Sequence, residues 1–336
     1  MTVDLPPYRP PRRFRSGHGQ TVWASQFRRV PPAGYRRETI GLPDGDRLDL
    51  DRADAAPASR RVVLLAHGLE GSTDRTYVRG MVRALVGRGW DAVAWNLRGC
   101  GGSPNGLLRS YHSGATEDLD AVVQHVLAER AAGRPRYDAV ALVGFSLGGN
   151  LTLKYLGDAG DTVDPHIVGA ACFSVPVDLA GSAEVMAGRT RRLYMARFMR
   201  SLAAKVEEKA GRFPETPSTA GMRRMRTFRE FDARFTAPVH GFESADDYWA
   251  RASALPVLGR IRVPTLLVNA LDDPFLSASC TPTGLANPDL IVLAPRWGGH
   301  VGFVSPGDEY WSETVAGRWL DAAWGRSEGR SQPRPV

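Results

Sequence analysis

The chain has 336 residues, of which 43% are hydrophobic, and its formal net charge is +7. No stretch approaches the roughly 18–20 consecutive apolar residues that cross a membrane, and residues 1–15 lack the apolar run of a secretory signal. The 3 cysteines are too few for a disulfide framework or a zinc site. These features predict a cytoplasmic protein that needs no metal or cofactor.

Apolar runs alternate with helical periodicity along most of the chain. The first feature is a hairpin around Asp44-Gly45, with its strands at residues 37–40 and 47–50. The predicted elements that follow are strand 62–66, helix 78–86, strand 92–95, helix 119–127, strand 139–143, a helix from residue 150, strand 168–175, strand 265–269, strand 290–293 and helix 311–324. This alternation predicts a mostly parallel sheet with helices on both faces.

The alternation stops between two of the predicted strands. Residues 178–258 are rich in Arg, Met and aromatic residues and are predicted to be helical, which favours a lid inserted into the core. The predicted organisation is therefore an N-terminal arm at residues 1–35, a core in two parts at residues 36–177 and 259–324, the lid between them, and a disordered tail at residues 325–336.

The sequence Gly144-Phe145-Ser146-Leu147-Gly148 is a G-x-S-x-G motif between a predicted strand and a predicted helix. A serine on such a sharp turn has its hydroxyl clear of the sheet, and the glycines allow neighbouring chain to pass close by. Ser146 is therefore the candidate nucleophile, and the Leu147 N–H is a candidate oxyanion donor at the start of the helix.

A serine nucleophile needs a base and an acid, which in folds with this turn follow it in the order acid, then histidine. Asp272 and Asp273 both follow the strand at residues 265–269, and His300 follows the last strand. Analogy with this fold favours Asp273 over Asp272 as the acid that orients the imidazole. The predicted catalytic residues are Ser146, Asp273 and His300.

A second oxyanion donor is expected in the loop after the first buried strand. That loop reads His67-Gly68-Leu69-Glu70-Gly71, and its glycines allow a backbone N–H to turn inward. The Leu69 N–H is the candidate donor. His67 is predicted to brace the loop by hydrogen bonds rather than to act in catalysis.

A glycine-rich loop and several arginine clusters could also be read as binding sites. The loop Arg98-Gly99-Cys100-Gly101-Gly102-Ser103 has Pro104 where a dinucleotide-binding loop needs its third glycine, so no cofactor is expected. Arginines cluster at residues 9–15, 189–200 and 223–229. Without a nucleic-acid-binding motif, they predict a solvated face, with peripheral contact with an anionic membrane as the alternative.

Several further motifs extend beyond the serine turn. They are Gly17–Trp23, His67–Ser72, Asn96–Ser103, Tyr111–Gly114, Gly144–Asn150, Phe231–Pro238, Gly241–Trp249, Asp272–Phe275 and Gly298–Phe303. With these motifs the chain resembles the YheT-like α/β-hydrolases, relatives of the animal α/β-hydrolase-domain lipases and the yeast medium-chain ethyl-ester synthases. Gly19 departs from the family pattern, which usually has Leu there. The resemblance implies an α/β-hydrolase fold, the same three catalytic residues and carboxylester hydrolysis.

The lid sequence indicates the kind of substrate. An apolar stripe follows its predicted helix at Leu193, Met195, Phe198, Met199, Leu202 and Val206. Such a stripe fits either an acyl-chain channel or packing of the lid on the sheet. The sequence thus predicts a serine carboxylesterase for small short-to-medium-chain acyl esters, with no nucleic-acid or obligate protein partner. Acyl transfer to alcohols and a non-catalytic lipid-binding role are the alternatives.

Overall fold

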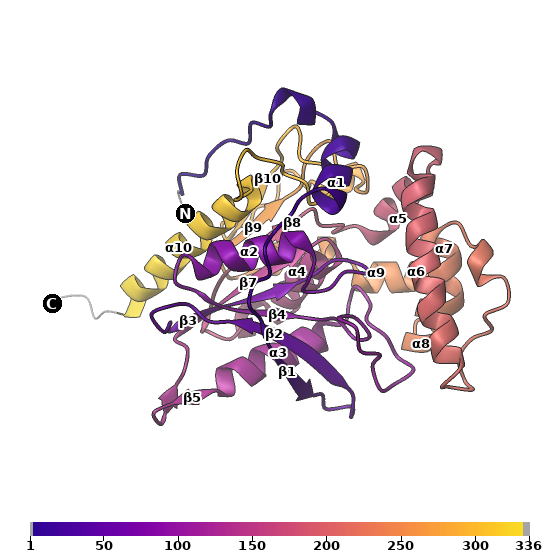
Figure 1. The fold of residues 1–336 in the computed structure, drawn as a ribbon, viewed down its shortest axis with the longest axis horizontal. Helices are drawn as coiled ribbons and strands as arrows, with labels where there is room; N and C mark the ends of the chain where they lie inside the picture. The colour runs from indigo at the N-terminus through magenta and orange to yellow at the C-terminus, as the bar shows by residue number, and fades with distance from the viewer. Residues whose placement is uncertain (1–2, 332–336) are drawn as a thin grey trace.

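The computed structural model describes residues 3–331 and contains an eight-stranded sheet with the order β1-β2-β4-β3-β7-β8-β9-β10 (Figure 1). Its strands are β1 (Arg36–Gly41), β2 (Arg47–Ala53), β3 (Arg61–Ala66), β4 (Asp91–Trp95), β7 (Ala139–Phe145), β8 (Ile167–Phe173), β9 (Thr265–Val268) and β10 (Leu290–Leu293). β1 and β2 are antiparallel, as is the pair formed by β2 and β4, and every other pairing in this sheet is parallel. A separate short hairpin pairs β5 (Arg130–Ala131) with β6 (Arg134–Pro135).

The α-helices in the described part of the chain pack on the two faces of the sheet or beside it. They are α1 (Gly17–Gln26), α2 (Thr76–Val86), α3 (Thr116–Ala128), α4 (Leu147–Ala159), α5 (Leu179–Ala187), α6 (Arg192–Ala210), α7 (Phe228–Phe231), α8 (Ala237–His240), α9 (Ala245–Ala252) and α10 (Trp311–Ser331). α3 and α4 pack on one face, whereas α2 and α10 pack on the other. Alternate residues of β3 divide between the two cores, as the two-residue repeat of a strand requires. None of the helices in the described part of the chain is both long and apolar enough to cross a membrane.

The predicted mostly parallel sheet with helices on both faces is confirmed, with the hairpin at one edge. The predicted start of the C-terminal tail is wrong. Helix α10 continues to Ser331, although the tail was predicted to be disordered from residue 325. The predicted tail at residues 332–336 lies outside the described part of the chain.

Five helices, α5 to α9, lie between β8 and β9 in the chain, where the sequence predicts the lid. They form a layer beside the sheet, with α6 as its longest helix (Figure 1). Their apolar side chains build two clusters of their own, one around Met195 and Met199 and one around Trp249. This insertion, which we call the helical layer, is therefore packed internally rather than draped on the core.

A buried ion cluster joins the edge hairpin to helix α3. The guanidinium of Arg98 donates to both carboxylate oxygens of Asp118, at 2.8 and 2.7 Å, and to Asp46 at 3.0 Å. The three side chains are at most 1% exposed. Although burial by itself lowers the pKa of Arg98, Asp118 and Asp44 raise it above its ordinary value, and the Asp44 carboxylate lies 2.8 Å from the guanidinium.

We expect Arg98→Met to lower the free energy of unfolding by about 3–5 kcal/mol, because it leaves two buried carboxylates without a cation. Thermal or urea unfolding measures the change. Arg60→Met is the matched control, since the Arg60–Asp138 pair lies on the surface and exposed pairs contribute little. Equal unfolding midpoints for the two variants would contradict the assignment.

Candidate active site

Ser146 lies on a sharp turn between β7 and α4. Its backbone has φ 52° and ψ −121°, a strained conformation for a residue with a side chain. The turn fits because its glycines permit very close contacts: a Cβ at Gly144 would lie 2.5 Å from the Gly149 Cα. A Cβ at Gly148 would lie 2.5 Å from the carbonyl oxygens of Ala66 and His67. The fold therefore requires the small residues that the motif supplies.

The structure brings the three predicted catalytic side chains together. The Ser146 Oγ lies 2.9 Å from the His300 Nε2. On the other side of the imidazole, Nδ1 lies 2.9 Å from one carboxylate oxygen of Asp273 and 3.2 Å from the other. Asp273 has a fully buried side chain, and that of His300 is 12% exposed. This is the geometry in which a histidine can take a proton from a serine while a carboxylate holds its orientation.

Asp272 points elsewhere. One of its carboxylate oxygens accepts the Gly299 N–H at 2.9 Å, and the other is buried without a hydrogen-bond partner among the described residues. Burial raises the pKa of Asp272, and the neighbouring Asp273 carboxylate raises it further. Of the two candidate acids, only Asp273 reaches the imidazole.

Both predicted oxyanion donors are free. The N–H groups of Gly68 and Glu70 donate to the hydroxyls of Tyr77 and Tyr111, each at 3.0 Å. Between them the Leu69 N–H has no partner among the described residues, and neither has the Leu147 N–H. Leu147 is the first residue of α4, whose N-terminus favours negative charge.

The helical layer contacts the loop that carries Leu69. The Glu70 backbone has φ 51°, and its carboxylate lies 2.8 Å from the Lys205 Nζ of α6. The same carboxylate accepts hydrogen bonds from Ser201 and Tyr111. Although burial by itself raises the pKa of Glu70, Lys205 and these hydrogen bonds hold it below its ordinary value. The loop is therefore anchored in a conformation that a free chain would rarely adopt.

His67 is a structural residue, as predicted. Its Nε2 accepts the Leu97 N–H at 3.2 Å, and its Nδ1 lies 2.8 Å from the Gly68 carbonyl oxygen. Burial lowers the pKa of His67 to about 4, so the ring is neutral near pH 7. A neutral ring with one donor and one acceptor satisfies both contacts.

The N-terminal arm supports His300, a contact that the sequence does not predict. The Thr21 Oγ of α1 accepts the His300 N–H at 2.8 Å and donates to the Gly17 carbonyl at 2.7 Å. Gly17 also packs against the Asp272 backbone, where a Cβ would lie only 1.8 Å from the carbonyl oxygen. The close spacing of Gly17 and Thr21 in a motif was the available signal, but nothing local in it points to His300.

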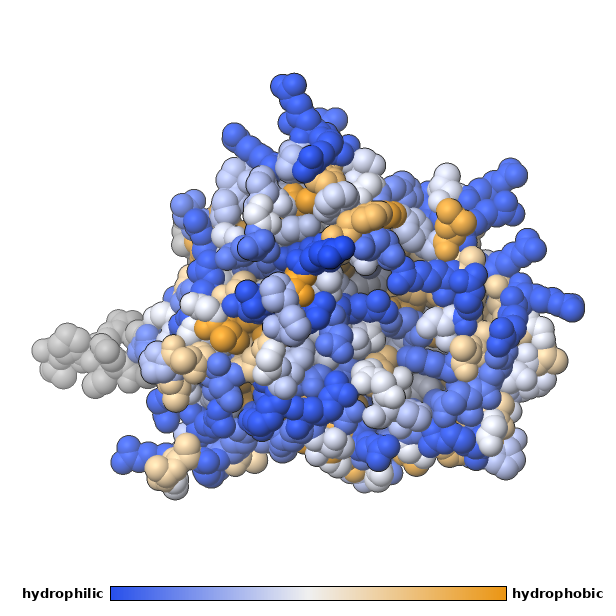
Figure 2. All heavy atoms as spheres, in the orientation of Figure 1, coloured by the Kyte–Doolittle hydropathy of each residue, from blue (hydrophilic) through white to orange (hydrophobic). Residues whose placement is uncertain are grey.

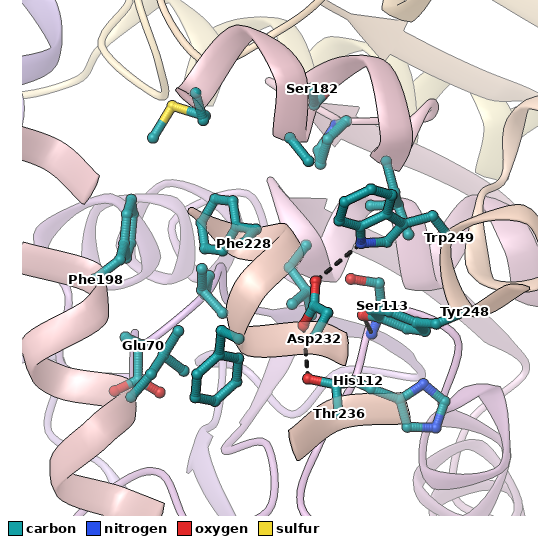
Figure 3. Close-up of a pocket in the computed structure, with 18 of the residues that line it drawn as sticks. Glu70, His112, Ser113, Ser182, Phe198, Phe228, Asp232, Thr236, Tyr248 and Trp249 are labelled. Carbon is teal, nitrogen blue, oxygen red and sulfur yellow. Dashed lines mark hydrogen bonds between the residues drawn. The ribbon is translucent and has the colours of Figure 1, made fainter. Parts of the chain in front are cut away.

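A cavity of about 150 Å³ lies beside Ser146 and His300. Figure 3 shows that Phe198 and Phe228 border it, and Met186, Leu202 and Val206 are among its other apolar lining residues. Part of the predicted apolar stripe of α6 thus faces this cavity, and most of the stripe packs within the helical layer. Leu193 is the exception, because its side chain is exposed at the start of α6. An apolar cavity next to a nucleophile suits an acyl chain.

Polar side chains also line the cavity (Figure 3). Asp232 begins a short π-helix and accepts hydrogen bonds from Thr236 at 2.6 Å and from the Trp249 Nε1 at 2.9 Å (Figure 3). Burial raises the pKa of Asp232 to about 6. The Ser113 N–H donates to the Tyr248 hydroxyl at 3.0 Å (Figure 3). Helix α9 of the helical layer therefore contacts both the motif at residues 231–238, through Trp249, and the motif at residues 111–114, through Tyr248.

Comparison with known proteins agrees with this architecture. A family model described as the alpha/beta hydrolase fold matches residues 61–293. The chain is 35% identical over 321 residues to YheT of Escherichia coli (strain K12), a protein named provisionally as an esterase, and the match covers 93% of this chain and 92% of YheT. The chain belongs to the YheT-like α/β hydrolases. The predicted resemblance is thereby confirmed.

Two more distant comparisons place this YheT-like hydrolase among its relatives. It is 30% identical over 300 residues to phospholipase ABHD3 of Homo sapiens, covering 86% of this chain and 71% of that protein. The structure of the esterase Pf2001 of Pyrococcus furiosus matches with a TM-score of 0.57 and 16% identity, covering 86% of this chain and 92% of Pf2001. At that identity, the structural match shows a shared fold.

Proposed function

We propose that this YheT-like hydrolase is a serine carboxylesterase that cleaves short-to-medium-chain acyl esters through an acyl-enzyme on Ser146. The observation that carries the proposal is the chain of contacts from Ser146 through His300 to Asp273. The esterase and phospholipase names of its relatives support ester hydrolysis as the reaction class.

In the proposed reaction, His300 Nε2 removes the proton from the Ser146 Oγ as that oxygen attacks the ester carbonyl carbon. The carbonyl π electrons move onto its oxygen, which the Leu69 and Leu147 N–H groups stabilise. When the C=O bond re-forms, the alcohol leaves with the proton from His300. Water then attacks the acyl-enzyme by the same steps and releases the carboxylic acid and Ser146.

The apolar cavity supports an aliphatic acyl group as the part of the substrate that is bound. Release of p-nitrophenol from a series of esters, from acetate to dodecanoate, tests this proposal. We expect the highest kcat/KM at the decanoate or a shorter ester, because the cavity is small and closed in by aromatic rings. No turnover of any aliphatic ester would contradict the substrate class.

A cavity variant tests whether this space receives the chain. We expect Phe198→Ala to shift the best ester toward longer chains, because the Phe198 ring borders the cavity (Figure 3). Phe213→Ala is the control, since Phe213 follows α6 and does not line the cavity. The same chain-length profile in wild type and Phe198→Ala would place the acyl chain elsewhere.

A further inference from the structure

Large apolar side chains are exposed at few places on this protein. Among the residues whose side chains the structure describes, five large hydrophobic residues are exposed. They are Val22 (41% exposed), Trp23 (38%), Phe27 (60%), Leu193 (86%) and Leu271 (65%). A single exposed apolar residue is ordinary, so their significance depends on where they lie.

All five lie on three segments that contact one another. The His18 Nδ1 of α1 lies 3.1 Å from the Tyr194 hydroxyl of α6, and their rings stack at 5.7 Å. Leu193 precedes Tyr194 in the chain, and Val22 follows His18 by one helical turn, on the same side of α1. In Figure 1, α1 lies at the top of the view and the helical layer with α6 lies to its right.

Trp23 and Phe27 extend this region along α1, and Leu271 extends it toward the loop after β9. Trp23 contacts Phe27, with ring centroids 5.3 Å apart. Leu271 is next to Asp272, whose carbonyl packs against Gly17 at the start of α1. We call the surface formed by Val22, Trp23, Phe27, Leu193 and Leu271 the docking face.

The docking face adjoins the candidate active site. The Tyr194 ring packs edge-on against Phe275 at 4.8 Å, and the Phe275 ring lies 4.2 Å from the imidazole of His300. Two aromatic contacts thus connect Tyr194, the residue after exposed Leu193, to the candidate base. Whatever binds this face is held beside the reacting serine.

The segments around the docking face are basic. Residues 5–29 and 188–206 contain no Asp or Glu. Their exposed arginines without a carboxylate within 4 Å among the described residues are Arg9, Arg12, Arg13, Arg15, Arg29, Arg189, Arg192, Arg197 and Arg200. Figure 2 shows apolar side chains set among projecting hydrophilic ones over α1 and the helical layer.

We propose that the docking face binds the surface of an anionic phospholipid bilayer. Exposed Trp, Phe and Leu side chains enter the boundary between headgroups and acyl chains, while neighbouring arginines attract anionic headgroups. Contact of this kind lies on the membrane and does not span it. It would present bilayer esters to the cavity, but binding itself does not depend on the proposed hydrolysis.

Charge argues against a second copy of the chain as the occupant. Two copies meeting through this face would bring two sets of unpaired arginines together, and like charges repel at such an interface. An anionic bilayer has the opposite charge and a deformable apolar interior, which accommodates side chains that project singly. The face therefore complements a lipid surface better than it complements itself.

Co-sedimentation with vesicles tests the proposal, using the Ser146→Ala variant so that no lipid is hydrolysed. One set of vesicles is pure phosphatidylcholine, and the other contains equal parts of phosphatidylcholine and phosphatidylglycerol. We expect at least about tenfold more bound protein on the anionic vesicles, and less as salt rises, because salt screens exposed charges.

Two variants in this background separate the docking face from general charge. Phe27→Ser with Leu193→Ser removes exposed apolar area, and Arg192→Glu with Arg197→Glu reverses local charge; each is expected to reduce binding at least about tenfold. Arg134→Glu, on the exposed β5–β6 hairpin, is compared with Arg197→Glu alone, since each reverses one charge, and it is expected to reduce binding less than twofold. These surface changes should leave the unfolding midpoint unaltered.

Three outcomes would overturn the proposal. They are absence of binding to both vesicle sets, equal loss of binding in Arg134→Glu, and a dimer in light scattering that disappears in Phe27→Ser with Leu193→Ser. Failure here leaves turnover of dispersed p-nitrophenyl esters by the wild type unaffected, so it is distinguishable from failure of the proposed esterase activity.

Discussion

Ser146→Ala is expected to lower kcat/KM for the best p-nitrophenyl ester by roughly 10⁴-fold or more, because the acyl-enzyme has no other oxygen on which to form. The Ser146 Oγ lies 2.9 Å from the His300 Nε2. The strained backbone of Ser146 holds this oxygen within reach of the imidazole. The initial rate of p-nitrophenol release, measured at equal folded protein concentration, gives the ratio.

The control for this experiment is Ser218→Ala, an exposed serine outside the cavity, which should retain full activity. Labelling with a fluorophosphonate adds an independent measurement, because the probe reacts only with an activated serine. The wild type should be labelled and Ser146→Ala should not. Substantial activity in Ser146→Ala would remove Ser146 from the mechanism, and labelling without ester turnover would redirect the search to other acyl substrates.

Asp273→Asn is expected to lower kcat by roughly 10⁴-fold while leaving KM nearly unchanged. An amide at this position cannot stabilise the imidazolium as a carboxylate does, and its NH₂ group favours the wrong imidazole tautomer. The prediction rests on the contact between Asp273 and the His300 Nδ1 at 2.9 Å. Steady-state kinetics across the ester series measures both parameters.

Asp272→Asn is the matched control, because it makes the same chemical change one residue away. The new side chain can still accept the Gly299 N–H, so we expect kcat within about tenfold of the wild type. If Asp272→Asn were the more damaging substitution in kcat, the acid would be assigned to the wrong residue. Equal unfolding midpoints would exclude a difference in stability as the cause.

Much of the fold could be predicted because its signals are local. The buried runs that became β3, β4 and β7 are short and apolar, and the helices between them repeat with helical spacing. The end of α10 was harder, because polar residues after residue 325 carry no periodicity that requires a helix. A helix already started on the core extends at little cost, since propagation is easier than nucleation.

The secondary-structure elements and the positions of the candidate catalytic residues along the chain follow from local patterns in the sequence. Ser146, Asp273 and His300 each follow a strand of the sheet, and the carboxyl ends of parallel strands meet at one edge of a sheet. The positions of these three residues after their strands therefore predict that they lie close together.

The contacts between side chains, by contrast, arise from the packing of whole elements. This packing separated Asp273 from its neighbour Asp272, brought Thr21 of the N-terminal arm under His300, and paired Glu70 with Lys205 of α6. It also brought α1, the start of α6 and the loop after β9, which carry the exposed apolar residues, into contact with one another. Such contacts join residues far apart in the chain, and their geometry depends on how whole elements pack, which no local pattern of residues encodes.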